Sequence, residues 1–383
     1  MSTALRPRRS ALLAAVLAVL AAGALPGQQM PERPRLPAAA DTNDWEAYYD
    51  YATTLLRQDP GRADAAMRWA ARLDPTRAEP LFGRYVTYWL RYPERFGEYL
   101  RGTEKVLRMG EVQAVDSLRN LAMRRNPFVH QGLIFVVYDQ LPGRYREDVA
   151  TTAWLAYANG RLPQALTLFA RAIERDPERY GYLHFTRAGA FVNQASYDSA
   201  LVEVTTLLTD LRQRDEQQVG RLYESKEMLE YAAGLLQAQR ARTDEARAAL
   251  GRATVENYAF APAHAALGQL ALARGDTGEA VREYGLAVEL DGADPVLRLG
   301  YGDALLRARR VADAVPHFQA ALRAEPHYAE VYLRLGIAFE ALGMKVEART
   351  AYGEFVRRAP RGAPALPQVR QRLQLLAADG GAS

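Results

Sequence analysis

Residues of the same type recur every 34 positions in the second half of this 383-residue chain. Glycine holds one such phase, alanine a second, and a bulky apolar residue a third. The members are Gly234, Gly268, Gly302 and Gly336, then Ala246, Ala280, Ala314 and Ala348, then Leu250, Tyr284, Phe318 and Tyr352. A fixed period of this length is the signature of a stacked repeat, so the repeats must be recognised before any domains are counted.

Each repeat has room for two short helices. In one copy, residues 296–308 and 312–324 carry helical patterns and are separated by a short turn. Two antiparallel helices joined in this way approach closely only where side chains are small. Gly302 and Ala314 meet this requirement, and Phe318 is expected to fill the space one turn later. One such pair cannot bury its apolar face alone, so each pair is expected to stack on the next.

The pattern resembles the tetratricopeptide repeat family, which has a small residue on the first helix, an alanine and an aromatic residue on the second, and a proline after it. In the copy that starts at Ala329, the matching residues are Leu335, Gly336, Phe339, Gly343, Ala348, Tyr352 and Pro360. The resemblance covers most of residues 44–362. It implies an all-α fold, a right-handed superhelical solenoid of antiparallel helix pairs with about seven to eight repeats and a C-terminal capping helix.

The strength of the pattern divides the chain. Divergent N-terminal helical repeats with an insertion are expected over residues 43–145, and the tetratricopeptide repeat array over 146–362. A capping helix and tail are expected over 363–383, because apolar residues return there at helical spacing. These apolar residues are Leu366, Val369, Leu373 and Leu376.

Residues 91–144 fit the repeat least well, and two interpretations stay open. The first is a degenerate repeat with a long insertion between its helices. The second is a small strand or inserted element, because the run from Leu133 to Tyr138 is β-prone by composition. Segments that break a regular pattern often carry function, so this region is a candidate site.

The N-terminus has the pattern of an export signal. Three arginines, Arg6, Arg8 and Arg9, precede an uncharged apolar run that ends in small residues near Ala24. This order predicts a cleaved signal peptide over residues 1–24, followed by an extended linker over 25–42. We therefore expect an exported chain, periplasmic or secreted, with no integral span after cleavage. An uncleaved anchor is the weaker alternative, because the run is shorter than the ~20 residues that cross a bilayer.

The composition and motifs indicate a binding protein rather than an enzyme. The chain has no cysteine, and its five histidines (His130, His184, His264, His317 and His327) form no metal-binding spacing. We expect packing roles for His184 and His264 and surface positions for His317 and His327. Gly300 and Gly302 are interpreted as helix-contact residues rather than a dinucleotide loop. No catalytic residue, cofactor or metal is expected. Without the N-terminal arginines the 49 basic and 45 acidic residues nearly balance, so no nucleic-acid partner is expected.

The resemblance implies a concave groove lined by the first helix of each pair, open to a peptide or partner protein. The candidate groove residues are Tyr182, Phe185, Met228, Tyr231, Leu235, Gln269, Val296, Leu299, Asp303, Leu306, Leu333 and Ile337. They hold no lysine for the carboxylate clamp that some family members have, and Asn193 is the one asparagine at such a position. Leu299→Glu and Tyr231→Glu are expected to weaken binding without loss of helicity. The alternative is that neighbouring helices or the C-terminal cap cover these side chains.

The sequence therefore predicts an exported, non-enzymatic protein–protein interaction scaffold. Two other functions stay open. One is a helical scaffold for an envelope enzyme, a hydrolase of cell wall or protein, with its site in residues 91–144. The other is a structural subunit of an envelope complex.

Overall fold

The computed structural model describes residues 32–107, 109–129, 133–141, 149–217 and 225–378. The expected signal peptide, residues 1–24, lies outside these ranges. The described residues form α-helices and no β-strand, as expected. They divide into two compact units. Unit 1 comprises residues up to Tyr48, Arg72–Pro75 and residues from Ala271 onward, and unit 2 comprises Tyr49–Ala71 and Thr76–Leu270. Helices α2 (Trp45–Leu55), α3 (Pro60–Leu73) and α16 (Ala261–Arg274) contribute residues to both units.

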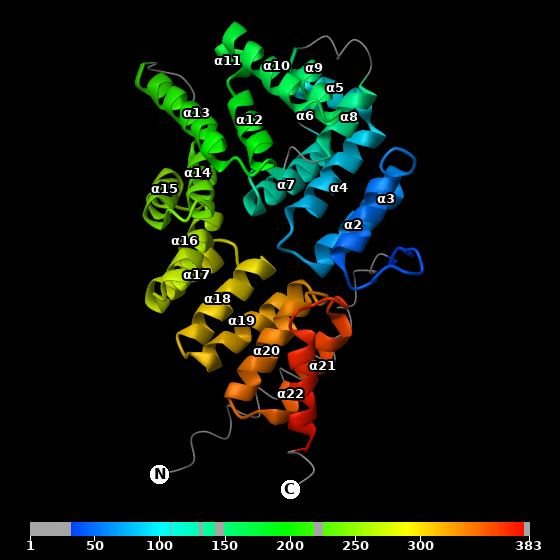
Figure 1. Cartoon of the computed structure of the whole chain (residues 1–383), viewed down its shortest axis with the longest axis vertical. Helices are drawn as coiled ribbons and strands as arrows, with labels where there is room; N and C mark the ends of the chain where they lie inside the picture. The colour runs from blue at the N-terminus through cyan, green and yellow to red at the C-terminus, as the bar shows by residue number, and fades with distance from the viewer. Residues whose placement is uncertain (1–31, 108, 130–132, 142–148, 218–224, 379–383) are drawn as a thin grey trace. The chain divides into compact units, whose positions relative to one another are not determined.

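Unit 1 contains the most regular repeats. They are built from α17 (Thr277–Leu290), α18 (Pro295–Arg307), α19 (Val311–Ala324), α20 (Ala329–Ala341) and α21 (Lys345–Arg358), and α22 (Leu366–Ala378) follows. Each helix packs on the next one along the chain, as Figure 1 shows in yellow to red. Leu366, Val369 and Leu376 of α22 are buried in the same core as the repeats. The capping helix expected from the sequence is confirmed.

Two glycines let α18 pack closely on both of its neighbours. A Cβ atom placed on Gly300 would overlap the Tyr284 ring of α17, and one placed on Gly302 would overlap the Phe318 ring of α19. The expected helix-contact role of this glycine pair is therefore confirmed. Gly336 has the same relation to Tyr352 on the next pair.

The turns inside the pairs place one residue in the left-handed region. Gly275, Arg309 and Gly343 occupy this position in successive repeats, with φ values of 80°, 59° and 72°. Glycine adopts this conformation freely, whereas a side chain costs about 1 kcal/mol there.

Arg309→Gly is therefore expected to raise the free energy of unfolding by about 0.5–1 kcal/mol, and Gly343→Ala to lower it by about 1 kcal/mol. Urea unfolding of the two variants measures both changes. Changes of the same sign at these equivalent positions would contradict the argument.

The N-terminal segment of unit 1 bonds to its C-terminal repeats. Asn43 Nδ2 donates to the Arg357 carbonyl oxygen at 2.8 Å, across 314 residues of sequence. The backbone N–H of Arg361 donates to Asp41 Oδ2 at 2.6 Å. Residues 32–42, the described part of the expected linker, form no helix, but their end is anchored to the residues that follow α21. The side chain of Asp44 accepts a hydrogen bond from the first turn of α2, at the Glu46 N–H.

Unit 2 contains less regular pairs. α9 (Val149–Ala158) packs on α10 (Leu162–Arg175), which the short α11 (Pro177–Tyr180) follows. α12 (Leu183–Val192) packs on α13 (Tyr197–Gln217), and α14 (Glu227–Gln239) on α15 (Thr243–Glu256). In the last pair, a Cβ on Gly234 would lie 2.7 Å from Leu250 Cγ, so small-against-large packing continues here. Counted along the described residues, the successive helix pairs are compatible with the seven to eight repeats expected.

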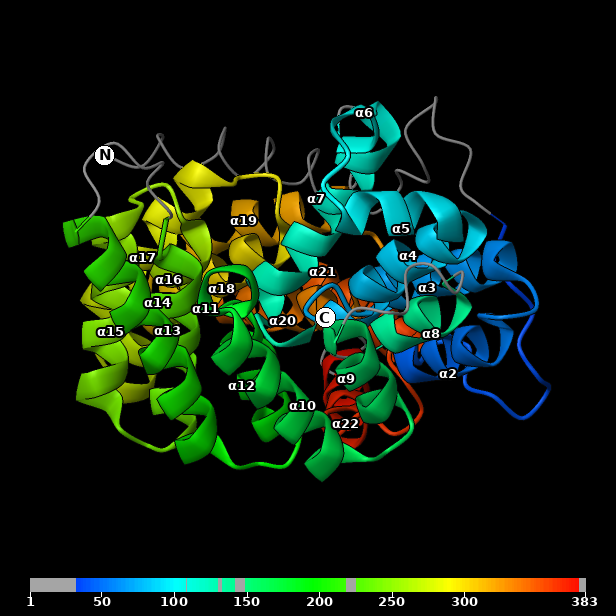
Figure 2. The ribbon, with the colours of Figure 1, turned by 90° about the horizontal axis from the view of Figure 1, so that it is seen from above.

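The irregular region is a helix pair with an insertion. α4 (Ala78–Arg91) packs on α7 (Gly110–Arg125), and α5 (Pro93–Leu100) and α6 (Glu104–Leu107) lie between them in sequence. Figure 2 shows α5 and α6 beside this pair. The β-prone run is the helix α8 (Ile134–Gln140), which packs on α4 and α9. This arrangement agrees with the first interpretation, a helix pair with an insertion. The strand expected as the alternative is wrong, because tertiary packing decides the state of so short an apolar run.

Candidate functional site

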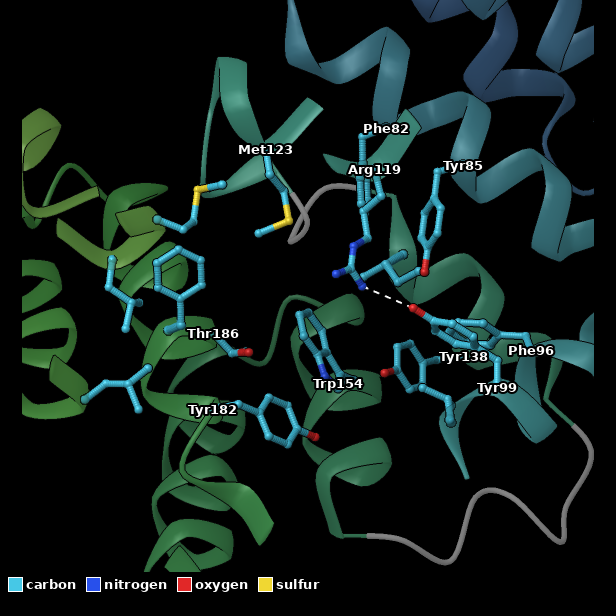
Figure 3. A pocket seen from close by; sticks show the side chains of 16 residues that line it. Phe82, Tyr85, Phe96, Tyr99, Arg119, Met123, Tyr138, Trp154, Tyr182 and Thr186 are labelled. Carbon is cyan, nitrogen blue, oxygen red and sulfur yellow. Dashed lines mark hydrogen bonds between the residues drawn. The ribbon is translucent and has the colours of Figure 1, made fainter. Parts of the chain in front are cut away.

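Unit 2 contains a cavity of about 410 Å³, which is within the size range of ligand-binding pockets. Helices α4, α5, α7, α8, α9, α12, α13 and α14 and the residue before α12 contribute side chains to it (Figure 3). The lining residues are Phe82, Tyr85, Phe96, Tyr99, Leu100, Arg119, Met123, Ile134, Tyr138, Trp154, Tyr182, Phe185, Thr186, Leu207, Met228 and Leu229. We refer to this set as the aromatic pocket.

Aromatic rings in mutual contact form one wall of the pocket. The Phe96 ring meets Tyr138 edge-on with centroids 5.5 Å apart, and Tyr138 stacks on Trp154 at 5.7 Å. Trp154 in turn meets the buried ring of Phe169 edge-on at 5.5 Å. Such ring pairs add about 0.5–1.5 kcal/mol each beyond the burial of their area. The wall is therefore fixed by packing before any ligand arrives.

The insertion between α4 and α7 supplies the residues that make this pocket unlike a regular repeat. The short helix α5 begins with Pro93 at a position where the missing N–H costs nothing. Phe96 is buried and anchors α5 against Trp89 of α4, with centroids 5.3 Å apart. One turn later Tyr99 reaches the pocket. Residues 91–144, singled out because they break the repeat, thus provide much of the lining.

Arg119 of α7 is the one charged residue among the lining residues. Its Nη1 donates to the Tyr99 hydroxyl at 3.3 Å, and that hydroxyl donates to Asp116 Oδ1 at 3.2 Å. Burial lowers the pKa of Arg119, but Tyr85, Tyr99 and Asp116 raise it by more, so the pKa is raised and the group stays charged. Burial also raises the pKa values of Tyr85 and Tyr99, so both hydroxyls stay protonated at neutral pH.

Three of the twelve groove residues expected from the sequence meet in the aromatic pocket. Tyr182, Phe185 and Met228 all line it. Tyr182 is 54% exposed and Leu100 is 44% exposed, so the pocket is open to solvent on their side. Phe185 stacks on Phe128, with ring centroids 5.2 Å apart.

Three other groove residues are buried, and their expected accessibility was wrong. Tyr231, Leu299 and Leu333 are 6%, 8% and 8% exposed. The Tyr231 hydroxyl donates to the Arg124 carbonyl oxygen at 3.0 Å, and its ring meets Phe260 edge-on. Residues at the end of α7 thus cover part of the face of α14 that the repeat pattern leaves open. The burial of these three side chains agrees with the alternative interpretation, in which neighbouring parts of the protein cover them.

The remaining groove residues do not gather in the aromatic pocket. Leu235, Val296, Asp303 and Leu306 are half-buried, and Gln269 and Ile337 are exposed. Asp303 is ion-paired with Arg334 at 2.9 Å, and Arg334 also bonds Glu330. Burial raises the pKa of Asp303 although Arg334 opposes this.

Most residues of the pocket are not evident from the repeat pattern of the sequence. Among them are Phe96, Tyr99, Arg119, Tyr138 and Trp154, which are not among the expected groove residues. The available signal was the high aromatic content of the region between the first repeat and the regular array, which the 34-residue period does not require. That signal shows aromatic enrichment, but it does not show which rings converge.

The histidines have mostly structural contacts. His184 Nδ1 bonds Glu203 Oε2 at 2.7 Å, and His264 Nε2 bonds the Tyr258 carbonyl oxygen at 3.1 Å. His317 and His327 were expected at the surface, but both are half-buried. Burial and the nearby cations Arg72, Arg358 and Arg33 lower the pKa of His327 to about 4. His130 lies outside the described residues. In the ranges that the structure describes, no cluster of acidic residues and histidines suits a metal ion.

The fold and pocket define a repeat protein of stacked antiparallel helix pairs. A family model for the tetratricopeptide repeat matches residues 151–207, in unit 2, and 299–363, in unit 1. These two segments of the chain are tetratricopeptide repeats.

Solved structures with similar folds cover about half to three-fifths of the chain. PilF of Pseudomonas aeruginosa is 16% identical over 59% of this chain and 97% of its own, with a TM-score of 0.46. YrrB, described as a protein with an unusual peptide-binding site, is 18% identical over 54% of this chain and 98% of its own, with a TM-score of 0.42. The C-terminal part of a repeat protein from Cytophaga hutchinsonii is 17% identical over 60% of this chain and 88% of its own, with a TM-score of 0.48. No match was found among curated proteins.

Proposed function

We propose that this protein is an interaction scaffold that takes a large apolar side chain of a partner protein into the aromatic pocket of unit 2. Tetratricopeptide repeats form scaffolds for protein–protein interaction, and the chain has that fold. The observation that carries the finer proposal is the pocket itself, because its rings are packed against one another yet open to solvent beside Tyr182. Concave aromatic sites of this kind bind the anchor residues that dominate many interfaces.

The size of the pocket supports a side chain or short segment as occupant. A volume of about 410 Å³ accommodates one large side chain with its flanking backbone, but not a packed helix. Met123 and Met228 lie among the rings, and flexible thioethers adapt to anchors of different shape.

Tyr182→Ala is expected to weaken binding of a capped hexapeptide with a central tryptophan by about tenfold, because the variant loses exposed aromatic area at the pocket edge. The parent chain should bind this peptide more tightly than the same peptide with a central alanine. Ligand-observed NMR titration measures both affinities. The matched control is Tyr258→Ala, because Tyr258 is similarly exposed in unit 2, at 61%, and does not line the pocket.

Equal affinity for the tryptophan and alanine peptides would contradict the proposal. So would equal loss of affinity in Tyr182→Ala and Tyr258→Ala.

We also propose that the protein is exported and acts outside the cytoplasm. The arginines before the apolar run and the small residues near Ala24 support this proposal. In the described ranges, no helix has both the length and the hydropathy that crossing a bilayer requires. N-terminal sequencing of the chain recovered from periplasm or medium tests the proposal. A mature start at Leu25 is expected, and recovery only in the cytoplasm with the N-terminus intact would overturn it.

The enzyme alternative gains no support from the pocket. A hydrolase site needs carboxylates or histidines that converge on the substrate, whereas the lining residues include neither.

A further inference from the structure

The aromatic pocket contains an unsatisfied hydrogen-bond donor. Arg119 Nε is buried and has no hydrogen-bond partner among the described residues. Figure 3 shows the guanidinium group directed into the space between the aromatic rings. A buried donor without an acceptor is unfavourable, and more so when the group is charged. A ligand acceptor that reaches this guanidinium group from the pocket would offset part of that cost.

The charge around Arg119 is only partly balanced. Asp116 is the carboxylate nearest to it through hydrogen bonds, and it acts through the Tyr99 hydroxyl rather than by direct contact. No ion pair joins Arg119 to a carboxylate within the ranges that the structure describes. The other lining residues are apolar or neutral. An apolar surround with one cation strengthens attraction for an anion, because the effective dielectric constant is lower than that of water.

We infer that the partner segment which enters the aromatic pocket carries a carboxylate within one or two residues of its large apolar side chain, and that this carboxylate accepts hydrogen bonds from Arg119. The inference rests on the proposed function, since it specifies the ligand of the same pocket. The apolar side chain packs on the wall of Phe96, Tyr138 and Trp154, and the carboxylate reaches Arg119 on α7. The occupant is thus an acidic–aromatic segment of a partner protein.

Two capped dipeptides test the charge requirement. Acetyl-Trp-Asp-amide and acetyl-Trp-Asn-amide have nearly the same shape and differ in one negative charge. By NMR titration of the full chain, the aspartate peptide is expected to bind about tenfold more tightly than the asparagine peptide. Arg119→Gln should remove this preference, and Arg119→Lys should retain part of it. Arg124→Gln, an exposed arginine of the same helix that does not line the pocket, should leave the preference unchanged.

The outcomes separate the inference from the proposed function. If the tryptophan hexapeptide binds but the two dipeptides bind equally, the pocket stands and the anion requirement is overturned. A preference that persists in Arg119→Gln assigns the charge recognition elsewhere and also overturns the inference. If neither the hexapeptide nor the dipeptides bind, the proposed function fails together with the inference. Far-UV circular dichroism and the unfolding midpoint confirm that each variant is folded.

Discussion

Tyr231→Glu is expected to abolish cooperative folding of unit 2 rather than weaken binding alone. The Tyr231 ring is 6% exposed, packs edge-on against Phe260 with centroids 5.4 Å apart, and donates to the Arg124 carbonyl oxygen. Glutamate at this position would bury an unpaired charge, lose the ring contact and leave the carbonyl without its donor. Substitutions that combine these effects destabilise by more than about 4 kcal/mol.

Urea unfolding followed by far-UV circular dichroism measures this effect. Tyr258→Glu is the matched control because Tyr258 is 61% exposed, and it is expected to change the free energy of unfolding by less than about 0.5 kcal/mol. A Tyr231→Glu variant that unfolds at the same urea concentration as the parent would show that this side chain is not buried in solution.

Phe318→Ala is expected to lower the free energy of unfolding of unit 1 by about 3–5 kcal/mol. The Phe318 ring is 0% exposed and fills the space that Gly302 leaves on α18. Removing the ring creates a cavity that the rigid helix pair cannot close, because neither Gly302 nor Ala314 has a side chain long enough to fill it.

Val346→Ala on α21, at 72% exposed, is the control and should be nearly neutral. Urea unfolding of both variants provides the comparison. A loss below about 1 kcal/mol in Phe318→Ala would mean that the pair repacks around the missing ring.

The sequence was enough to predict the helix pairs because they depend on local patterns. Gly300 and Gly302 contact the large rings of Tyr284 and Phe318 on neighbouring helices. The 34-residue period predicts where the small residues and the large rings of such contacts lie. The capping helix follows from the same periodicity. These features need no knowledge of distant segments.

The candidate groove was predicted less well because accessibility depends on distant segments. The period correctly assigns Tyr231 to one face of α14, but the backbone of Arg124, 107 residues away, covers that face. Tyr182, Phe185 and Met228, three of the expected groove residues, all line the aromatic pocket. Phe96 and Tyr99, which line the same pocket, lie in an insertion that is not part of the repeat pattern. The 34-residue period therefore cannot predict that they lie near these residues.

The bond from Asn43 to the Arg357 carbonyl oxygen alters how the last repeats can come apart. In a nearest-neighbour stack the terminal hairpin frays first, at little cost. Here opening α21 also breaks contacts made by residues more than 300 positions earlier in the sequence, so local fraying is suppressed. The same contacts raise the mean sequence separation in unit 1, which slows folding relative to a plain repeat stack. During synthesis on the ribosome, the segment with Asp41 and Asn43 emerges long before the last repeats. Its contacts with them can form only after those repeats have been synthesised.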